Sequence, residues 1–247
     1  MRTAQENNYG ENLSQHLAEL IARQTKTGQE IAEDFPLYAP RQNLSRFLVR
    51  HELFKKVLGL KGSIIEGGVF RGAGLMSWAQ LSAIYEPVNY QRQIIGFDTF
   101  SGFPNIKPVD TGGPVKNPLA KRGGLAADSY HELEKVVKLY DANRGLSHMP
   151  KVRLVRGNFM KTGLLYIKQN PHLIISLLYL DFDIYEPTRE ALKLFLPRMS
   201  KGGIIAFDEV NNPDWPGETK ALLESLDLNC YPLQQFPYEP NISFLTL

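Results

Sequence analysis

The sequence predicts an α/β fold in which a mostly parallel sheet carries helices on both faces. Short apolar runs typical of buried strands alternate with helical segments over most of the chain, as they do around parallel sheets. Two of these runs end abruptly in carboxylates, and a third ends in an acid followed by glycines. Hydrophobic residues make up 43% of the 247 positions, which is enough for one sizeable core.

The first part of the chain is predicted to be helical. Apolar residues recur at helical spacing over 10–24 and from about 44 to 58, whereas 34–43 contains two prolines and is expected to be a link. We expect residues 1–60 to form an N-terminal helical segment that acts as a lid or as the contact of a homo-oligomer. Residues 61–247 are expected to form the main domain.

The main domain is expected to alternate strands with helices and to end in an antiparallel hairpin. The expected strands are 63–70 (which includes a glycine turn), 92–100, 151–159, 172–183 and 202–209, with the hairpin over 233–247. The expected helices are 74–86, 189–200 and 218–227, with a short helix between the third and fourth strands.

A long segment without hydrophobic periodicity interrupts this alternation at about 101–128. It is rich in glycine and proline, and loops of this length inside a compact domain are usually lids, binding loops or disordered segments. Because it follows the second strand, it would be able to close over a site at the end of that strand. A tolerated surface insertion is the alternative.

Composition excludes several classes of protein. A net charge of +2, from 28 basic and 26 acidic residues, gives no reason to expect nucleic acid or an anionic membrane as a partner. The single cysteine, Cys230, excludes an internal disulfide, and the five histidines lack the spacing of metal ligands. The polar start and the absence of an apolar run of about 20 residues lead us to expect a cytoplasmic protein.

Two apolar runs that end in acids are the most informative feature of the chain. The first run contains Asp181 and Asp183 and reads LLYLDFDIYEPT (177–188). The second contains Asp208 and Glu209 and reads GGIIAFDEVN (202–211). If the two strands are adjacent and parallel, these acids converge at the carboxyl edge of the sheet, where open α/β sheets bind ligands. Converging carboxylates repel one another unless a cation lies between them, and hard oxygen ligands suit magnesium.

A glycine-rich turn follows the first strand of the main domain. Neither the dinucleotide fingerprint G-x-G-x-x-G nor a phosphate-binding loop is present in the sequence from Glu66 to Gly74. Asp98 ends the next strand and is placed to take the two hydroxyls of a ribose, while Glu66 would hold an ammonium group. An adenosine that carries a charged amino acid fits this pattern better than NAD does. A turn used only for packing is the alternative.

The chain resembles the macrocin O-methyltransferase family from about residue 46 to 227. The segments that carry the resemblance are IIEGGVFRGAG, GFDTFSGFP, LVRGNF, LYLDFDIYEPT, GGIIAFDE and WPGETKAL, in the order of the family. The resemblance implies a class I methyltransferase (Rossmann-like) fold with a seven-stranded sheet. It also implies magnesium-dependent transfer of a methyl group from S-adenosylmethionine to a sugar hydroxyl of a natural product or nucleotide sugar.

The resemblance also assigns roles to the acids. It implies a magnesium ion held by Asp181, Asp208 and Glu209, and the 27-residue spacing from Asp181 to Asp208 matches the family. The family has Asp-Asp where this chain has Asp208-Glu209, so Glu209 is either a ligand or a group beside the ligands. We expect Asp181 to act also as the base that takes the proton of the hydroxyl. Asp183 is the alternative base, unless it only orients the start of the following helix.

The remaining expected contacts surround the cofactor. We expect Asn158 to read the adenine edge with Phe159 packed nearby, Ser101 to assist the ribose or the amino-acid portion, and Arg71 to contact the carboxylate or to lie on the surface. The full set of expected cofactor residues is Glu66, Gly68, Arg71, Gly72, Asp98, Ser101, Asn158 and Phe159.

Three other functions stay open at this point. The acceptor would be a catechol-like phenol if the metal arrangement is kept and the pocket differs. The protein would be a non-catalytic nucleotide-binding protein if the acid cluster is broken. A nicotinamide oxidoreductase is disfavoured by the missing fingerprint. Trp215 would form the rim of a sugar site or part of a plain turn, and Arg41, Arg46 and Arg50 would meet a diphosphate or face solvent.

Overall fold

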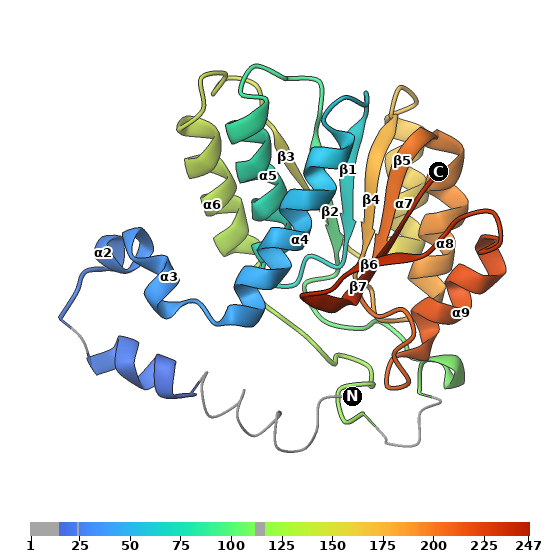
Figure 1. Ribbon diagram of the computed structural model, residues 1–247, viewed down its shortest axis with the longest axis horizontal. Helices are drawn as coiled ribbons and strands as arrows, with labels where there is room; N and C mark the ends of the chain where they lie inside the picture. Colours follow the sequence, from blue (N-terminus) through green and yellow to red (C-terminus); the bar gives the residue numbers. More distant parts are fainter. Residues whose placement is uncertain (1–14, 24, 112–116) are drawn as a thin grey trace. The chain divides into compact units, whose positions relative to one another are not determined.

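The computed structural model describes residues 15–23, 25–111 and 117–247 (Figure 1). The chain divides into two compact units, of which the first ends at Leu48 and the second is Val49–Leu247. Helix α4 (Arg41–Val57) begins in the first unit and ends in the second. Within the described residues, no helix is both long enough and apolar enough to cross a membrane.

The described residues of the first unit are largely helical, and their helices continue into the expected link. Residues 15–23 are helical, and the rest of the helix expected over 10–24 lies outside the described residues. α2 (Gly28–Glu33) begins with a capping box between Thr27 and Glu30. α3 (Phe35–Tyr38) lies inside the expected link, because a proline is tolerated in the first turn of a helix.

The second unit is built on a seven-stranded sheet with the strand order β3-β2-β1-β4-β5-β7-β6. Strands β1 to β5 are parallel to one another, and β7 is antiparallel to both β5 and β6. This confirms the predicted mostly parallel sheet and the final hairpin. The strands are β1 (Ser63–Gly67), β2 (Ile94–Asp98), β3 (Val152–Arg156), β4 (Ile175–Leu180), β5 (Met199–Phe207), β6 (Gln234–Phe236) and β7 (Glu239–Thr246).

Helices cover both faces of this sheet (Figure 1). The end of α4, with α5 (Ala73–Tyr85) and α6 (Tyr130–Ala142), packs on one face, and α7 (Phe159–Gln169), α8 (Tyr185–Phe195) and α9 (Pro216–Ser225) pack on the other. Two short 3₁₀ turns are Pro108–Asp110 and Leu196–Arg198. α6 was not among the predicted helices. α8 begins four residues earlier than the predicted 189, since Pro187 is accepted in its first turn.

Successive residues of the central strands point into two separate cores. Ile64 of β1 packs with Leu75, Trp78 and Tyr179 on one face of the sheet, and the next residue, Ile65, packs in the cluster on the other face. Burial on both faces explains why these strands are continuous apolar runs. From β1 the chain adds β2 and β3 on one side, and from β4 it adds β5 on the other side. In doubly wound sheets, ligands bind where the strand order reverses in this way.

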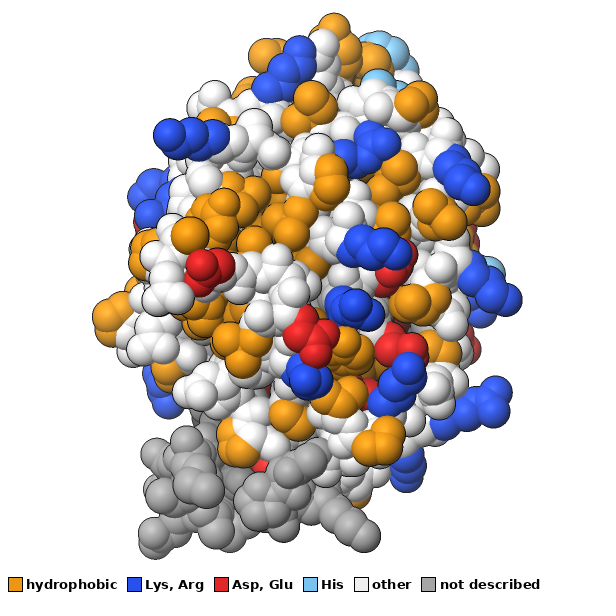
Figure 2. Space-filling view, turned by 90° about the vertical axis from the view of Figure 1, so that its right-hand side faces the viewer, with side chains coloured by type: hydrophobic (Ala, Val, Ile, Leu, Met, Phe, Trp, Pro, Cys, Tyr) orange, Lys and Arg blue, Asp and Glu red, His pale blue; other side chains and the backbone are white. Residues whose placement is uncertain are grey.

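The surface carries both signs of charge in close proximity. Figure 2 shows basic and acidic side chains next to one another among apolar ones on the face that it draws. This face therefore presents no extended field of one sign, in keeping with the net charge of +2.

Candidate active site

The carboxyl ends of β4 and β5 place two of the predicted acids at the centre of the sheet edge. The backbone N–H of Asp181 donates to the carbonyl of Gly67 at the end of β1, at 2.7 Å. The N–H of Asp208 donates to the carbonyl of Leu180 at 3.0 Å. The hydrogen bonds between the strands thus continue up to both acids. Asp181 and Asp208 therefore lie next to each other and next to the glycine turn.

Asp98 fixes the conformation of the glycine turn. Its Oδ2 accepts hydrogen bonds from the backbone N–H groups of Val69 (2.7 Å) and Phe70 (2.8 Å), and its Oδ1 accepts one from Phe100 (2.6 Å). A carboxylate offers about four lone-pair sites. Three of them are used here, so one site remains for another donor, such as a ribose hydroxyl.

The turn has a backbone that depends on glycine. Gly68 and Gly72 both have φ of +88°, in the left-handed region that favours glycine. A Cβ added at Gly68 would overlap the carbonyl oxygen of Asp181. The glycine turn therefore contacts the segment that carries Asp181. A cofactor on the turn would lie next to the acids, as a group transfer between neighbouring ligands requires.

Glu66 lies in the interior behind the turn. It is 2% exposed, its Oε2 accepts a hydrogen bond from the indole N–H of Trp78 at 2.5 Å, and the guanidinium of Arg50 lies nearby. Burial raises the pKa of Glu66 to about 7, although Arg50 opposes this rise. In this structure Glu66 therefore joins α4 and α5 to β1, and it does not face the open edge.

Asp208 is buried and continues the same polar interior. It is 3% exposed, and its Oδ1 accepts a hydrogen bond from the hydroxyl of Tyr179 at 2.7 Å. The guanidinium of Arg50 lies over the Tyr179 ring, 5.1 Å from its centroid. Asp208 is thus held in a fixed orientation from behind. Polar and aromatic contacts connect it to Glu66.

Glu218 is a buried acid beside the predicted site, and it was not among the predicted site residues. It is fully buried in the first turn of α9, and its carboxylate accepts hydrogen bonds from the N–H groups of Phe182 (3.1 Å), Asp183 (3.2 Å) and Glu209 (3.0 Å). Burial raises the pKa of Glu218 well above its ordinary value, and the negative charges of Asp183, Asp208 and Glu209 raise it further. A sequence signal for this residue existed, because Glu218 lies in WPGETKAL, one of the segments that carry the resemblance to the family.

The acids suit a hard divalent ion by their chemistry. Asp181, Asp208 and Glu209 supply oxygen ligands, and Glu218 lies buried beside Asp208 and Glu209, whose negative charges a cation would neutralise. The Glu209 carboxylate accepts a hydrogen bond from the side-chain amide of Asn212. Over the described part of the chain, no three His, Cys, Asp or Glu side chains are gathered closely enough to hold a metal. The acids therefore fit magnesium in the chemistry of their oxygens, and not in their spacing in this structure.

The structure places Asn158 and Phe159 in structural positions. Asn158 is the N-cap of α7, and its side chain accepts a hydrogen bond from the N–H of Met160 at 3.0 Å. Phe159 is 4% exposed and packs edge-on against Phe97, with a centroid distance of 5.3 Å. Asn158 therefore lies next to the edge, whereas the ring of Phe159 belongs to the core beneath it.

The other two expected cofactor residues lie on the surface. Arg71 is exposed, and its guanidinium lies 5.0 Å from the centre of the Phe70 ring. Ser101 is also exposed, and its N–H donates to the hydroxyl of Thr99 at 3.1 Å. Arg71 lies in the glycine turn after β1, and Ser101 belongs to the segment that directly follows β2.

The long loop is anchored beside the acids in its described parts. Phe103 packs against Trp215 with a centroid distance of 5.5 Å, and Ile184 completes this small apolar cluster. Buried Asp110 accepts a hydrogen bond from the N–H of Tyr185 at 2.7 Å, at the start of α8. Trp215 is therefore 7% exposed in this structure and does not form an open rim.

Solved structures show the same fold over the whole chain. The crystal structure of CalS11, described as a calicheamicin methyltransferase, has a TM-score of 0.91 and 34% identity, and it covers 100% of this chain and 94% of that one. An apo structure of CalS11, described as a TDP-rhamnose 3'-O-methyltransferase of calicheamicin biosynthesis, has a TM-score of 0.83 and 32% identity over 100% and 96% of the two chains. The O-methyltransferase NovP, at 18% identity and a TM-score of 0.63, shows the fold alone. The predicted class I methyltransferase fold is thereby confirmed.

Sequence comparisons agree with this result. The 8-demethyl-8-(2,3-dimethoxy-alpha-L-rhamnosyl)-tetracenomycin-C 4'-O-methyltransferase of Streptomyces olivaceus is 28% identical over 61% of this chain and 54% of its own length. The mycinamicin III 3''-O-methyltransferase of Micromonospora griseorubida is 24% identical over 78% of this chain and 75% of its own length. The chain thus spans about half the length of the first of these relatives. The family model described as "Macrocin-O-methyltransferase (TylF)" matches residues 11–219, so the chain belongs to the macrocin O-methyltransferase family.

Proposed function

We propose that this protein is an S-adenosylmethionine-dependent, magnesium-dependent O-methyltransferase that acts on a sugar hydroxyl of a nucleotide sugar or glycosylated natural product. The observation that carries the proposal is the similarity over the whole chain to CalS11, described as a TDP-rhamnose 3'-O-methyltransferase. A deoxysugar linked to a nucleoside diphosphate is therefore the first acceptor to test.

The cofactor would bind on the glycine turn. Asp98 has a lone-pair site free of backbone donors for a ribose hydroxyl, and the glycines let a ligand approach the backbone. Arg71 in this turn and Ser101 in the segment after β2 would contact the polar ends of the cofactor. Gly68, Gly72, Asn158 and Phe159 would shape the site, and Glu66 would act on the ammonium group from behind the turn.

The acids would bind magnesium and take a proton. Asp181, Asp208 and Glu209 would hold the ion, and Asp181, or alternatively Asp183, would accept the proton of the acceptor hydroxyl at its carboxylate. When bound, S-adenosylmethionine supplies a methyl group on its sulfonium, and magnesium lowers the pKa of a hydroxyl that it contacts. The contribution of the protein is to align the two ligands, since Gly68 and Asp181 are in contact.

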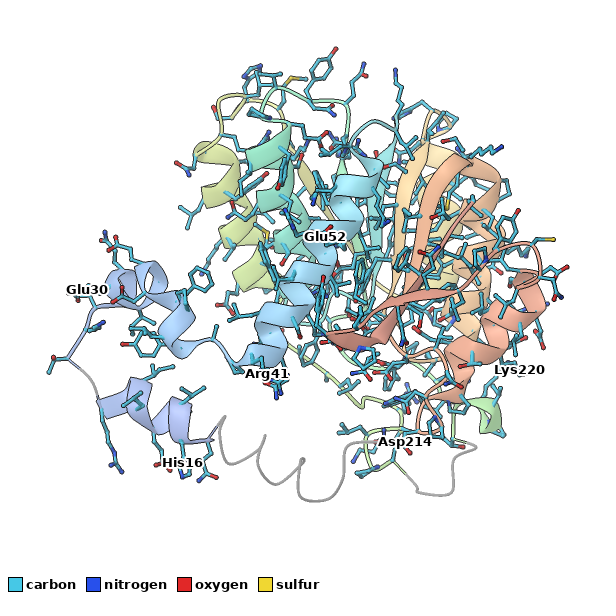
Figure 3. All side chains as sticks on the ribbon, viewed as in Figure 1. His16, Glu30, Arg41, Glu52, Asp214 and Lys220 are labelled. Carbon is cyan, nitrogen blue, oxygen red and sulfur yellow. The ribbon has the colours of Figure 1, made fainter. Side chains whose placement is uncertain are left out.

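Calorimetric titration with S-adenosylhomocysteine, with and without magnesium, tests the cofactor site. We expect wild type to bind and Asp98→Ala to bind about tenfold more weakly or not at all, because two N–H groups of the glycine turn and the N–H of Phe100 lose their acceptor. Asp214→Ala is the matched control, because Asp214 is exposed on the segment between β5 and α9 (Figure 3). A folded wild type that binds nothing in either condition would refute the proposal.

A second assay tests the acceptor. TDP-rhamnose and a catechol are each incubated with S-adenosylmethionine and the enzyme, with magnesium or with a chelator. We expect methylated TDP-rhamnose, detected by mass spectrometry as a gain of one methyl group, only when magnesium is present. Methylation of the catechol alone would replace the sugar acceptor with a phenolic one. Equal turnover in the chelator would remove magnesium from the proposal.

A further inference from the structure

One buried carboxylate connects the two acid-bearing segments of the proposed active site. Glu218 Oε1 accepts from the N–H groups of Phe182 and Asp183, in the segment after β4. Its Oε2 accepts from the N–H of Glu209, in the segment after β5. These bonds are 3.0 to 3.2 Å long, and Glu218 is 0% exposed. The side chain thus bridges two segments that are remote in sequence.

A carboxylate at this position is costly for the fold. Glu218 lies among the negative charges of Asp183, Asp208 and Glu209, away from water. Burying an ionised group without a cation beside it is destabilising, and like charges increase the cost. The chemical reason for this choice is that a carboxylate has two acceptor oxygens. An amide has one, so glutamine would leave one of the two segments facing an NH₂ donor.

The backbone that Glu218 holds is itself in an uncommon conformation. Asp183 has φ of +61°, in the left-handed region that residues other than glycine rarely adopt. Its N–H is one of the three groups bound by Glu218. Such a conformation persists only where the surroundings enforce it, and it is common at functional sites.

The start of α9 is built to bring Glu218 to this place. Trp215 is anchored on Phe103, Pro216 begins the helix, and Gly217 lies so close to α8 that a Cβ would be 2.6 Å from the backbone nitrogen of Tyr185. Glu218 follows immediately in the first helical turn, where the helix dipole favours a negative charge.

We infer that Glu218 is a positioning residue that sets the spacing of the two acid-bearing segments and so prepares Asp181, Asp208 and Glu209 for their ion and their proton. The inference rests on the proposed function. It assigns Glu218 no contact with substrate or cofactor. The residue acts through the backbone of Asp183 and of Glu209.

Glu218→Gln tests this role because it keeps the size of the side chain and removes one acceptor. We expect the amides of Asp183 or Glu209 to exchange hydrogen about tenfold faster by NMR, because one segment loses its acceptor. We expect Mn²⁺, titrated with S-adenosylhomocysteine present, to bind about tenfold to a hundredfold more weakly, as when groups that orient metal ligands are removed. Affinity for S-adenosylhomocysteine should stay within about twofold, since the turn depends on Asp98 instead.

Glu86→Gln is the matched control, and Glu218→Asp is the second variant. Glu86 is a largely buried acid that pairs with Arg92 at 2.9 Å, on the opposite edge of the sheet, so its loss should lower the melting temperature and leave Mn²⁺ binding intact. Glu218→Asp keeps the carboxyl group but is one methylene too short to reach both segments. It should therefore weaken Mn²⁺ binding as Glu218→Gln does.

The outcomes separate this inference from the proposed function. Unchanged Mn²⁺ affinity in Glu218→Gln would overturn the inference, and so would an equal loss of Mn²⁺ and S-adenosylhomocysteine binding, which marks general destabilisation. A wild type that binds S-adenosylhomocysteine but no Mn²⁺ would refute the proposed metal. In that case kcat decides: a fall of about tenfold with unchanged KM for S-adenosylmethionine supports positioning, and unchanged kcat overturns it.

Discussion

At the scale of single residues, Glu66 shows how the site region is held together at an electrostatic cost. Its carboxylate is 2% exposed and receives the Trp78 N–H, with Arg50 nearby. The low polarity of this environment disfavours the ionised form, and this effect exceeds the attraction of Arg50, so the pKa rises to about 7. The stability of the fold should therefore depend on pH through this residue.

The sign of that dependence follows from linkage. Below about pH 4.5 both states carry a protonated Glu66, and as pH rises toward 7 the unfolded state ionises first, which favours unfolding. Wild type should therefore lose about 3 kcal/mol more unfolding free energy between pH 4.5 and 8 than Glu66→Gln loses. Urea unfolding at both pH values measures this difference.

Glu52→Gln is the control for this prediction, because Glu52 lies on the surface of α4 with 38% of its side chain exposed (Figure 3). It should retain the pH dependence of wild type. If Glu66→Gln showed the same pH dependence as wild type, the buried carboxylate would not be the titrating group.

At the scale of elements, the effect of backbone strain in the turn between β1 and α5 can be distinguished from the effect of a steric clash by comparing two glycine substitutions. Gly68 (φ +88°) and Gly123 (φ +75°) are both left-handed, but only a Cβ at Gly68 would meet other atoms, namely the Asp181 backbone. Gly123→Ala should cost about 1 kcal/mol and leave S-adenosylhomocysteine affinity unchanged. Gly68→Ala should cost more and weaken binding by about tenfold, because the turn must move.

Calorimetric titration and urea unfolding of the two alanine variants measure both effects. Equal losses of stability and unchanged affinity in the two variants would show that the contact between the turn and Asp181 has no role in binding. The comparison matters because the proposed transfer needs the cofactor turn and the acids to lie against each other.

At the scale of the whole molecule, the sheet and most of its helices were predictable, and the tertiary contacts of the site were not. Strands buried on both faces must be apolar runs, so 63–70, 92–100 and 172–183 were recognisable. α6 buries fully only Leu133 and Tyr140, which leaves a narrow apolar stripe. The bridging role of Glu218 depends on the approach of α9 to α8, which no local pattern encodes. The burial of Phe159 was unpredictable for the same reason, since it depends on Phe97 and other distant rings.

The carboxyl and amino ends of the parallel strands, which form two opposite edges of the sheet, have different roles. The carboxyl edge collects acids that repel one another, and the opposite edge holds the buried Arg92, which is 3% exposed. Arg92 pairs with Glu86 at 2.9 Å and donates to the hydroxyl of Ser176 and to the carbonyls of Val57, Leu60 and Gly62. It thus joins the end of α4 to β1, β2 and β4. This edge supplies stability for a sheet whose other edge is built for chemistry.

Replacement of Arg92 by methionine should therefore affect stability without affecting binding. Arg92→Met leaves Glu86 largely buried without this partner and several carbonyls without a donor, and the loss should be about 3–5 kcal/mol of unfolding free energy. Arg153→Met, an exposed substitution near the same edge, should cost less than about 0.5 kcal/mol. Under conditions where Arg92→Met stays folded, its affinity for S-adenosylhomocysteine should equal that of wild type, because the glycine turn lies at the other edge of the sheet. Reduced affinity in the folded variant would show that the edges are coupled through the sheet, and the division of tasks would then be wrong.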